Sequence, residues 1–349
     1  EEQSRGYNPT IRDEPSDGGV MMRLSDAGKV GLSYYPRVTQ VIVNGVMQSG
    51  FSVMGGAPGD WGVSSNAAPA FGDWDGDGIA DLVIGGANGQ VVFFQNDGSP
   101  IVPNFVATPV DSTLATLWTN LGNIAPALGD WSGDGEADLA IGGATNVITL
   151  ISSVGGFANA APERITAFLS IPNTTLAIPA LAPPPGTHLC DLYVLRADGT
   201  VDRYSNTGVA SEPFLATSRM TNVLGSAVAN ATGLAVADMN KDGIPDVLVS
   251  DTYGSIYEFR GRSNQTYLAY GAGFAGSYAG LANRLTLAAG DFYGTGDRDI
   301  LGGFAEGGLL CLKNPTKHLL LDPPGVTLLN GQSAQFSARN AASAVTWSL

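Results

Sequence analysis

Short apolar runs alternate with loops rich in glycine, aspartate and proline along most of the chain. One such run, Leu82–Ile84, reads as a buried strand. The pair Asn88-Gly89 then marks a two-residue hairpin turn, and a second strand follows over 90–95. No long window shows helical periodicity, and the 47 glycines disfavour helices. The pattern therefore predicts an all-β chain of short strands joined by tight turns.

The loop before the first of these strands carries a cluster of carboxylates. Its acidic residues are Asp73, Asp75, Asp77 and Asp81. Alternate residues of a tight loop can turn toward one centre, and an all-oxygen ligand set suits a hard cation such as calcium. Gly76 and Gly78 permit the positive φ that such a loop needs. This is not an EF-hand, because that motif needs flanking helices and a glutamate where this chain has Ile84.

The loop-strand-turn pattern of residues 71–86 recurs along the chain. Close copies cover 128–143, 57 residues further on, and 236–249. A fourth copy at 289–303 keeps Asp291 and Asp299 but has Tyr293 and Thr295 at two acidic positions. The recurrence of loop, strand and turn together makes these matches specific.

Two further copies are degenerate. Residues 178–195 keep Asp191, but their loop has become Pro183-Pro184-Pro185 and supplies no carboxylate. Residues 20–35 match only the strand-turn-strand half. The central strands of the six units begin at Val20, Asp81, Asp138, Asp191, Asp246 and Asp299, with spacings of 61, 57, 53, 55 and 53 residues. A strand-rich period of roughly 50 residues favours four-stranded propeller blades over a β-solenoid, whose coils are usually shorter.

The pattern D-x-[DNS]-x-D-G-x-x-D followed by an apolar strand resembles the FG-GAP/VCBS repeat of integrin-α-type β-propellers. The resemblance implies an all-β propeller of six four-stranded blades over residues 1–321, with seven blades as the alternative, since such propellers often have seven.

The resemblance also implies about three structural calcium ions. The first would be bound by Asp73, Asp75, Asp77, the Ile79 carbonyl and Asp81; the second by Asp130, Ser132, Asp134, the Glu136 carbonyl and Asp138; the third by Asp238, Asn240, Asp242, the Ile244 carbonyl and Asp246. We expect no ion at the Asp291/Asp299 loop or at the proline-rich loop. The large apolar residue after the first loop aspartate (Trp74, Trp131, Met239 and Phe292) is predicted to pack between blades.

Composition limits the classes of partner that the protein can bind. The net charge of −15 disfavours nucleic acid and anionic membranes, and no apolar run reaches the length of a membrane span. Two cysteines are too few for a disulfide scaffold, so Cys190 and Cys311 are predicted to be buried small hydrophobes. Loops of this kind match millimolar external calcium, which predicts a secreted or cell-surface protein.

Residues 322–349 are similar to the opening of a bacterial Ig-like (Big) domain. About three strands fit here where a complete sandwich needs about seven. Two explanations remain open: the chain is a fragment of a longer protein, or a partner supplies the missing strands. The second would permit self-assembly through this region.

Catalysis finds little support in the sequence. The two histidines, His188 and His318, lie far apart in the chain, and no nucleophile, metalloprotease or phosphate-loop motif is present. Tyrosines gather in the last two units, where they suit a ligand face and ordinary strand packing equally well. The function predicted is a calcium-stabilised extracellular recognition or adhesion module for a protein or glycan. The alternatives are a structural subunit of a surface assembly and a module of a carbohydrate-active enzyme.

Overall fold

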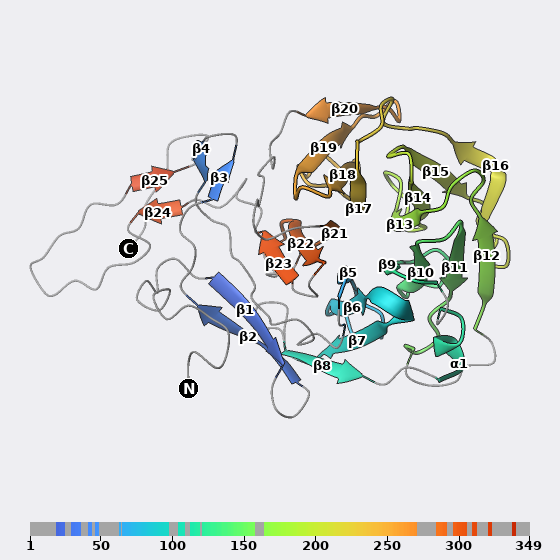
Figure 1. Cartoon of the computed structure of the whole chain (residues 1–349), viewed down its shortest axis with the longest axis horizontal. Coiled ribbons are helices and arrows are strands. Elements are labelled where there is room, and N and C mark those ends of the chain that lie inside the picture. The colour runs from blue at the N-terminus through green and yellow to red at the C-terminus, as the bar shows by residue number, and fades with distance from the viewer. Residues whose placement is uncertain are drawn as a thin grey trace, which may run out of the picture.

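The structure is a computed structural model of the whole chain, and it is built almost entirely of β-strands (Figure 1). It describes residues 19–24, 29–35, 41–43, 46–48, 63, 65–97, 104–108, 112–118, 121–157, 164–270, 284–291, 296–305, 309–312, 320–322 and 337–339. The only helical segments among them are the short α1 (Ser112–Ala115) and a 3₁₀ turn, η4 (Ala87–Gly89). None of the helices described is long and apolar enough to cross a membrane.

Five antiparallel blades make up the described part of the ring. The first contains β5 (Ala68–Gly72), β6 (Asp81–Gly85), β7 (Val91–Asn96) and β8 (Asn104–Thr108). The second contains β9 (Ile124–Gly129), β10 (Asp138–Gly143), β11 (Val147–Ile151) and β12 (Thr166–Ser170). The third contains β13 (Ala177–Ala182), β14 (Asp191–Arg196), β15 (Val201–Asn206) and β16 (Phe214–Met220). The fourth contains β17 (Ala231–Ala237), β18 (Asp246–Asp251), β19 (Ile256–Gly261) and β20 (Tyr267–Tyr270), and the fifth contains β21 (Leu285–Gly290), β22 (Asp299–Phe304) and β23 (Leu309–Leu312).

The first strands of the five blades surround a common axis, and the last blade packs directly on the first (Figure 1). Thr286 of β21 donates its hydroxyl to the carbonyl of Ala67, 219 residues away, at 2.7 Å. The backbone N–H of Ala67 in turn donates to Phe304 O at 3.0 Å. The ring therefore closes with five inner strands among the described residues, where six or seven blades are not found.

The unit at residues 20–35 is the reason for this miscount. It forms the hairpin of β1 (Gly19–Leu24) and β2 (Lys29–Tyr35), but β2 pairs with β8 at the outer edge of the first blade. It extends that blade instead of reaching the axis. Two small pairs, β3 (Val41–Val43) with β4 (Val46–Gln48) and β24 (Leu320–Asp322) with β25 (Ser337–Arg339), complete the described strands. The rest of the predicted Ig-like segment lies outside the described residues.

Paired glycines at the end of the second strand let neighbouring blades approach each other. A Cβ added to Gly85 would lie 2.6 Å from the carbonyl oxygen of Ile124 in the second blade. A Cβ on Gly142 would collide with Ala177 O in the third blade, and one on Gly303 with Ala67 O in the first. The Gly-Gly of the repeated motif is therefore a blade-contact signal, and Gly303 marks the point of ring closure.

We expect Gly303→Ala to destabilise the protein by about 1–3 kcal/mol, because the added methyl group forces two backbone segments apart. Gly72→Ala is the matched control, since its Cβ would meet only the Leu128 side chain, at 3.0 Å. Urea unfolding of both variants measures the difference. Equal losses would show that Gly303 does not hold a tight contact.

The large residue after the first loop aspartate packs between blades, as predicted. Trp74 is 2% exposed and contacts Phe93 of its own blade and Phe157 of the second. Trp131 and Met239 are buried in the same way against the third and fifth blades. Phe292 lies outside the described residues. The prediction that Cys190 is buried is also confirmed, whereas the structure says nothing of the Cys311 side chain.

Candidate metal centres at the blade loops

The acidic loops share a hydrogen bond that closes each loop. In each, the first aspartate accepts a hydrogen bond from the N–H five residues later: Asp73 from Gly78, Asp130 from Gly135, Asp238 from Gly243 and Asp291 from Gly296, at 2.7–3.1 Å. These glycines have φ between 76° and 91°, which only glycine adopts at no steric cost. The residue two positions before each blade strand also donates its N–H within its loop: Ile79 to Asp77, Glu136 to Asp134 and Ile244 to Asp242. The sequence pattern thus encodes the same turn several times.

Carboxylates converge in the first two loops. Asp73, Asp75 and Asp77 each offer an oxygen within 4.8 Å of the others, and so do Asp130, Asp134 and Asp138. The described residues contain no other such group of three acidic, histidine or cysteine side chains. Each of these oxygens that accepts one backbone N–H keeps a further lone pair for a cation.

The last aspartate of each loop also accepts hydrogen bonds from backbone N–H groups, because it is buried at the start of a strand. One of its oxygens accepts the N–H of the residue 15 positions later: Asn96 for Asp81, Ser153 for Asp138 and Gly261 for Asp246, at 2.8–2.9 Å. The other accepts the N–H of Trp74, Trp131 or Met239 at 2.9–3.1 Å. This carboxylate clamp ties the loop to the end of the next strand. Asp81 belongs to the clamp and lies outside the first carboxylate group.

Burial changes the acidity of the clamp residues. It raises the pKa of Asp81 and of Asp138 from 3.8 to about 7, and that of Asp246 to about 6, although the backbone hydrogen bonds act in the opposite direction. Neighbouring carboxylates of the same loops add to the rise. A cation at the loop would favour the charged forms and relieve this cost.

The second loop fits calcium best. The Ser132 hydroxyl, one of its expected ligands, is buried and has no hydrogen-bond partner among the described residues. An orphan oxygen beside three convergent carboxylates is a donor set that a hard cation satisfies. The first loop offers three carboxylates, one of which, Asp75, also accepts the Gln95 amide at 2.5 Å.

The third loop has the same fold but a different arrangement of side chains. Its carboxylates Asp238, Asp242 and Asp246 do not converge as the other two sets do. The Asn240 amide turns inward, donating to Asp242 Oδ2 at 3.0 Å and accepting the Asp242 N–H at 2.8 Å. The structure therefore brings together three carboxylates of the first expected set, without Asp81, and three of the second, but not those of the third.

In the third blade, an arginine occupies the role that the resemblance gives to a metal. Asp191 keeps the clamp, accepting the N–H of Asn206 at 2.8 Å. Its other oxygen accepts a hydrogen bond from Arg203 Nε at 2.8 Å and forms an ion pair with Arg203 Nη2 at 2.6 Å. Both side chains are over nine-tenths buried. A guanidinium therefore supplies a positive charge beside the carboxylate that follows the proline-rich loop.

The fifth blade uses a lysine from its neighbour. Lys241, in the third acidic loop, pairs with the buried Asp297 at 2.6 Å. Lys241 has a φ of 61° where the first two loops have Gly76 and Gly133. A non-glycine residue in this conformation is uncommon, and the ion pair between adjacent blades holds it there.

Sequence reasoning missed both of these internal cations. A signal did exist for Arg203, which lies 12 positions after Asp191, an aspartate that had lost its loop partners. The signal for Lys241 was weaker, since a lysine beside acidic residues is usually a solvated charge. Only the packing of adjacent blades shows that Lys241 reaches Asp297.

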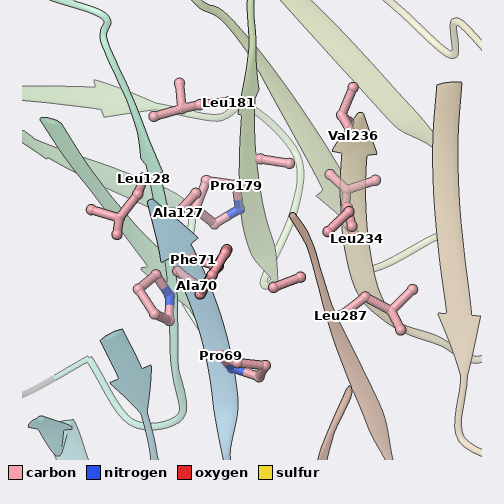
Figure 2. A pocket seen from close by; sticks show the side chains of 15 residues that line it. Pro69, Ala70, Phe71, Ala127, Leu128, Pro179, Leu181, Leu234, Val236 and Leu287 are labelled. Carbon is pink, nitrogen blue, oxygen red and sulfur yellow. The ribbon is translucent and has the colours of Figure 1, made fainter. Parts of the chain in front are cut away.

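The axis of the propeller is filled. Figure 2 shows side chains from all five inner strands meeting there, among them Ala70, Pro179 and Leu287. The cavity left between them is about 40 Å³ and is lined only by apolar residue types. It has room for water but not for a sugar or a cofactor. Two further cavities lie beside the third and fourth blades, and one of them also reaches Ala289 and Arg298 of the fifth.

Comparison with known proteins supports the repeat. The FG-GAP-like repeat family matches residues 73–141, which include the first two acidic loops. No curated protein matches the chain. Similar solved structures include a lectin of Agrocybe aegerita that recognises non-reducing terminal N-acetylglucosamine (18% identity, 82% of this chain and 74% of that one, TM-score 0.44). They also include the Aleuria aurantia lectin with α-methyl-L-fucoside (12%, 85% and 90%, TM-score 0.40) and BBS1N in complex with ARL6DN (11%, 87% and 93%, TM-score 0.34). The described sheets make the chain a β-propeller, and its residues 73–141 match the FG-GAP-like repeat.

Proposed function

We propose that the chain is a non-catalytic recognition module whose first two acidic loops bind calcium and whose blades present a glycan or protein ligand site. The observation that carries the proposal is the pair of convergent carboxylate groups on adjacent blades, Asp73/Asp75/Asp77 and Asp130/Asp134/Asp138. When bound, calcium would supply a fixed positive charge that holds each loop against its clamp.

The filled axis supports a binding role over a catalytic one. The cavity on the axis is lined by no acid, base or nucleophile. A rigid ring with loops pinned at its rim presents side chains on fixed elements, which favours recognition. We place the module outside the cell, where millimolar calcium would keep such loops occupied. We also propose that residues 322–349 belong to an Ig-like domain.

Calcium titration by calorimetry tests the metal part. We expect about two sites, and Asp130→Asn with Asp134→Asn to abolish one of them. The matched control is Asp198→Asn, because Asp198 is an exposed aspartate outside the acidic loops. Retention of every site in the loop variant would contradict the assignment.

The recognition part needs a separate measurement. A glycan array and pull-downs with surface proteins, each with calcium and with chelator, should give at least one calcium-dependent ligand. Turnover of a polysaccharide panel that is lost on changing a carboxylate outside the loops would instead establish the carbohydrate-active enzyme.

A further inference from the structure

The proline-rich loop of the third blade borders a cavity that also reaches Ile244 and Pro245 of the third acidic loop. The cavity measures about 260 Å³ and lies between the third and fourth blades. Pro184, Pro185, Tyr193 and Arg203 line it from one blade, and the β19–β20 turn with Tyr267 lines it from the other. Its size is just below the lower limit of about 300 Å³ for a drug-sized pocket, which suits one sugar ring.

Neutral hydrogen-bonding groups and flat apolar faces meet in this cavity. The hydroxyls of Tyr193 and Tyr267 lie 3.0 Å apart, and the Arg203 guanidinium lies 5.7 Å from the centre of the Tyr193 ring. Gln265, exposed at the mouth, accepts a hydrogen bond from Arg203 at 3.4 Å. Burial raises the pKa of both tyrosines, so their hydroxyls stay protonated and can both donate and accept. Proline and tyrosine faces beside hydroxyl and amide groups suit the two sides of a pyranose.

The charge of the cavity is opposite to that of the chain. Two of its eleven lining residues are arginines and none is acidic, although the net charge is −15. Arg203 is neutralised by Asp191 behind it. Arg262 is exposed, and its guanidinium forms no ion pair or hydrogen bond with any residue that the structure describes. A free guanidinium beside neutral polar groups favours a carboxylate, which it can bind through two parallel hydrogen bonds.

We propose that this cavity binds a carboxylate-bearing sugar of an acidic glycan, with Arg262 pairing the carboxylate and the Tyr193–Tyr267 hydroxyls and Gln265 contacting the ring hydroxyls. A second cavity of about 320 Å³ shares Pro184, Pro185 and Pro245 with the first. It provides room for the next sugar of the chain. The proposal rests on the recognition function above and names its ligand class.

The test is a titration of the whole chain with methyl glycosides in millimolar calcium, with binding monitored by NMR. The probes are methyl β-D-glucuronide and the methyl glycoside of N-acetylneuraminic acid, with methyl β-D-glucoside as the neutral control. We expect at least one acidic sugar to bind about tenfold or more tightly than the glucoside, because a hydrogen bond to a charged group is worth about that factor. Arg262→Gln should remove this preference, and Tyr267→Phe should weaken binding while the fold is retained.

Arg219→Gln is the matched control for charge. It removes the same charge from the third blade outside the cavity, and Asp202 keeps its ion pair with Arg196 at 2.9 Å. Its affinities should equal those of the unchanged protein. Equal binding of glucuronide and glucoside, or a preference that survives Arg262→Gln, would overturn the proposal. If the glycan array shows a ligand but no acidic sugar binds in this cavity, the proposed site is wrong and the recognition function stands. If the array shows no ligand and no acidic sugar binds, both proposals are wrong.

Discussion

Replacing Arg203 with alanine should lower the free energy of unfolding by about 3–5 kcal/mol, because it leaves a buried carboxylate without its counter-ion. Asp191 is 3% exposed, and its pairing with Arg203 combines a hydrogen bond from Nε with an ion pair to Nη2. The loop before Asp191 has no carboxylate that could recruit a metal in place of the guanidinium. Urea unfolding at neutral pH measures the loss.

The control for this prediction is Arg219→Ala. Arg219 also pairs with a buried aspartate, Asp202, at 2.6 Å, but Arg196 holds the same carboxylate. We therefore expect a clearly smaller loss. A double variant, Asp191→Asn with Arg203→Met, should recover part of the stability, since no charge is then left unpaired. Equal losses for Arg203→Ala and Arg219→Ala would show that the guanidinium does not replace a metal. If Arg203→Ala does not fold, Arg203→Lys keeps the charge and should cost less.

The second large effect is a reversal of the pH dependence of stability by calcium. Without the ion, we expect stability to fall as the pH rises from about 4 to about 7. The pKa of Asp81 and of Asp138 is raised from 3.8 to about 7 in the folded state. A raised pKa stabilises the folded state below the unfolded value, and this contribution is lost as the pH passes through the folded value. The loss is on the order of a few kcal/mol for each carboxyl.

With calcium the trend should invert, because the ion binds only deprotonated carboxylates. At a concentration a hundredfold above its dissociation constant, each ion adds about 2.7 kcal/mol of stability. Thermal unfolding at about pH 4 and about pH 8, each with calcium and with chelator, provides the four values needed. Asp81→Asn should flatten the metal-free dependence, whereas Asp198→Asn, at an exposed site, should not. A calcium effect of equal size at both pH values would contradict this account.

The local features of the fold could be predicted from the sequence because each depends on neighbours in the chain. The hairpin after the first loop forms as β6 and β7, with Asn88 and Gly89 at φ of 58° and 77°, although its turn, Ala87–Gly89, is one residue longer than predicted. The glycines of the acidic loops take the positive φ expected of them. Trp74 and Trp131 pack between blades, since a position that accepts any large apolar residue is a packing position.

The candidate site was predicted in part. Residue types and spacing identified the carboxylates of the first and second loops, which do converge. They did not reveal that Asp81 is enclosed by backbone donors, or that Asn240 turns its amide onto Asp242. These outcomes depend on burial and on side-chain rotation, which a spacing of residues does not specify.

By itself, the sequence determined an all-β chain of repeated hairpins, the turn of each acidic loop and the chemistry that those loops offer. Only the tertiary structure decided how many hairpins reach the axis and which charges complete each blade. Ring closure depends on Thr286 meeting Ala67, and the fifth blade depends on Lys241 meeting Asp297. Such contacts join residues of different blades, and their free energy appears only once the whole ring has formed.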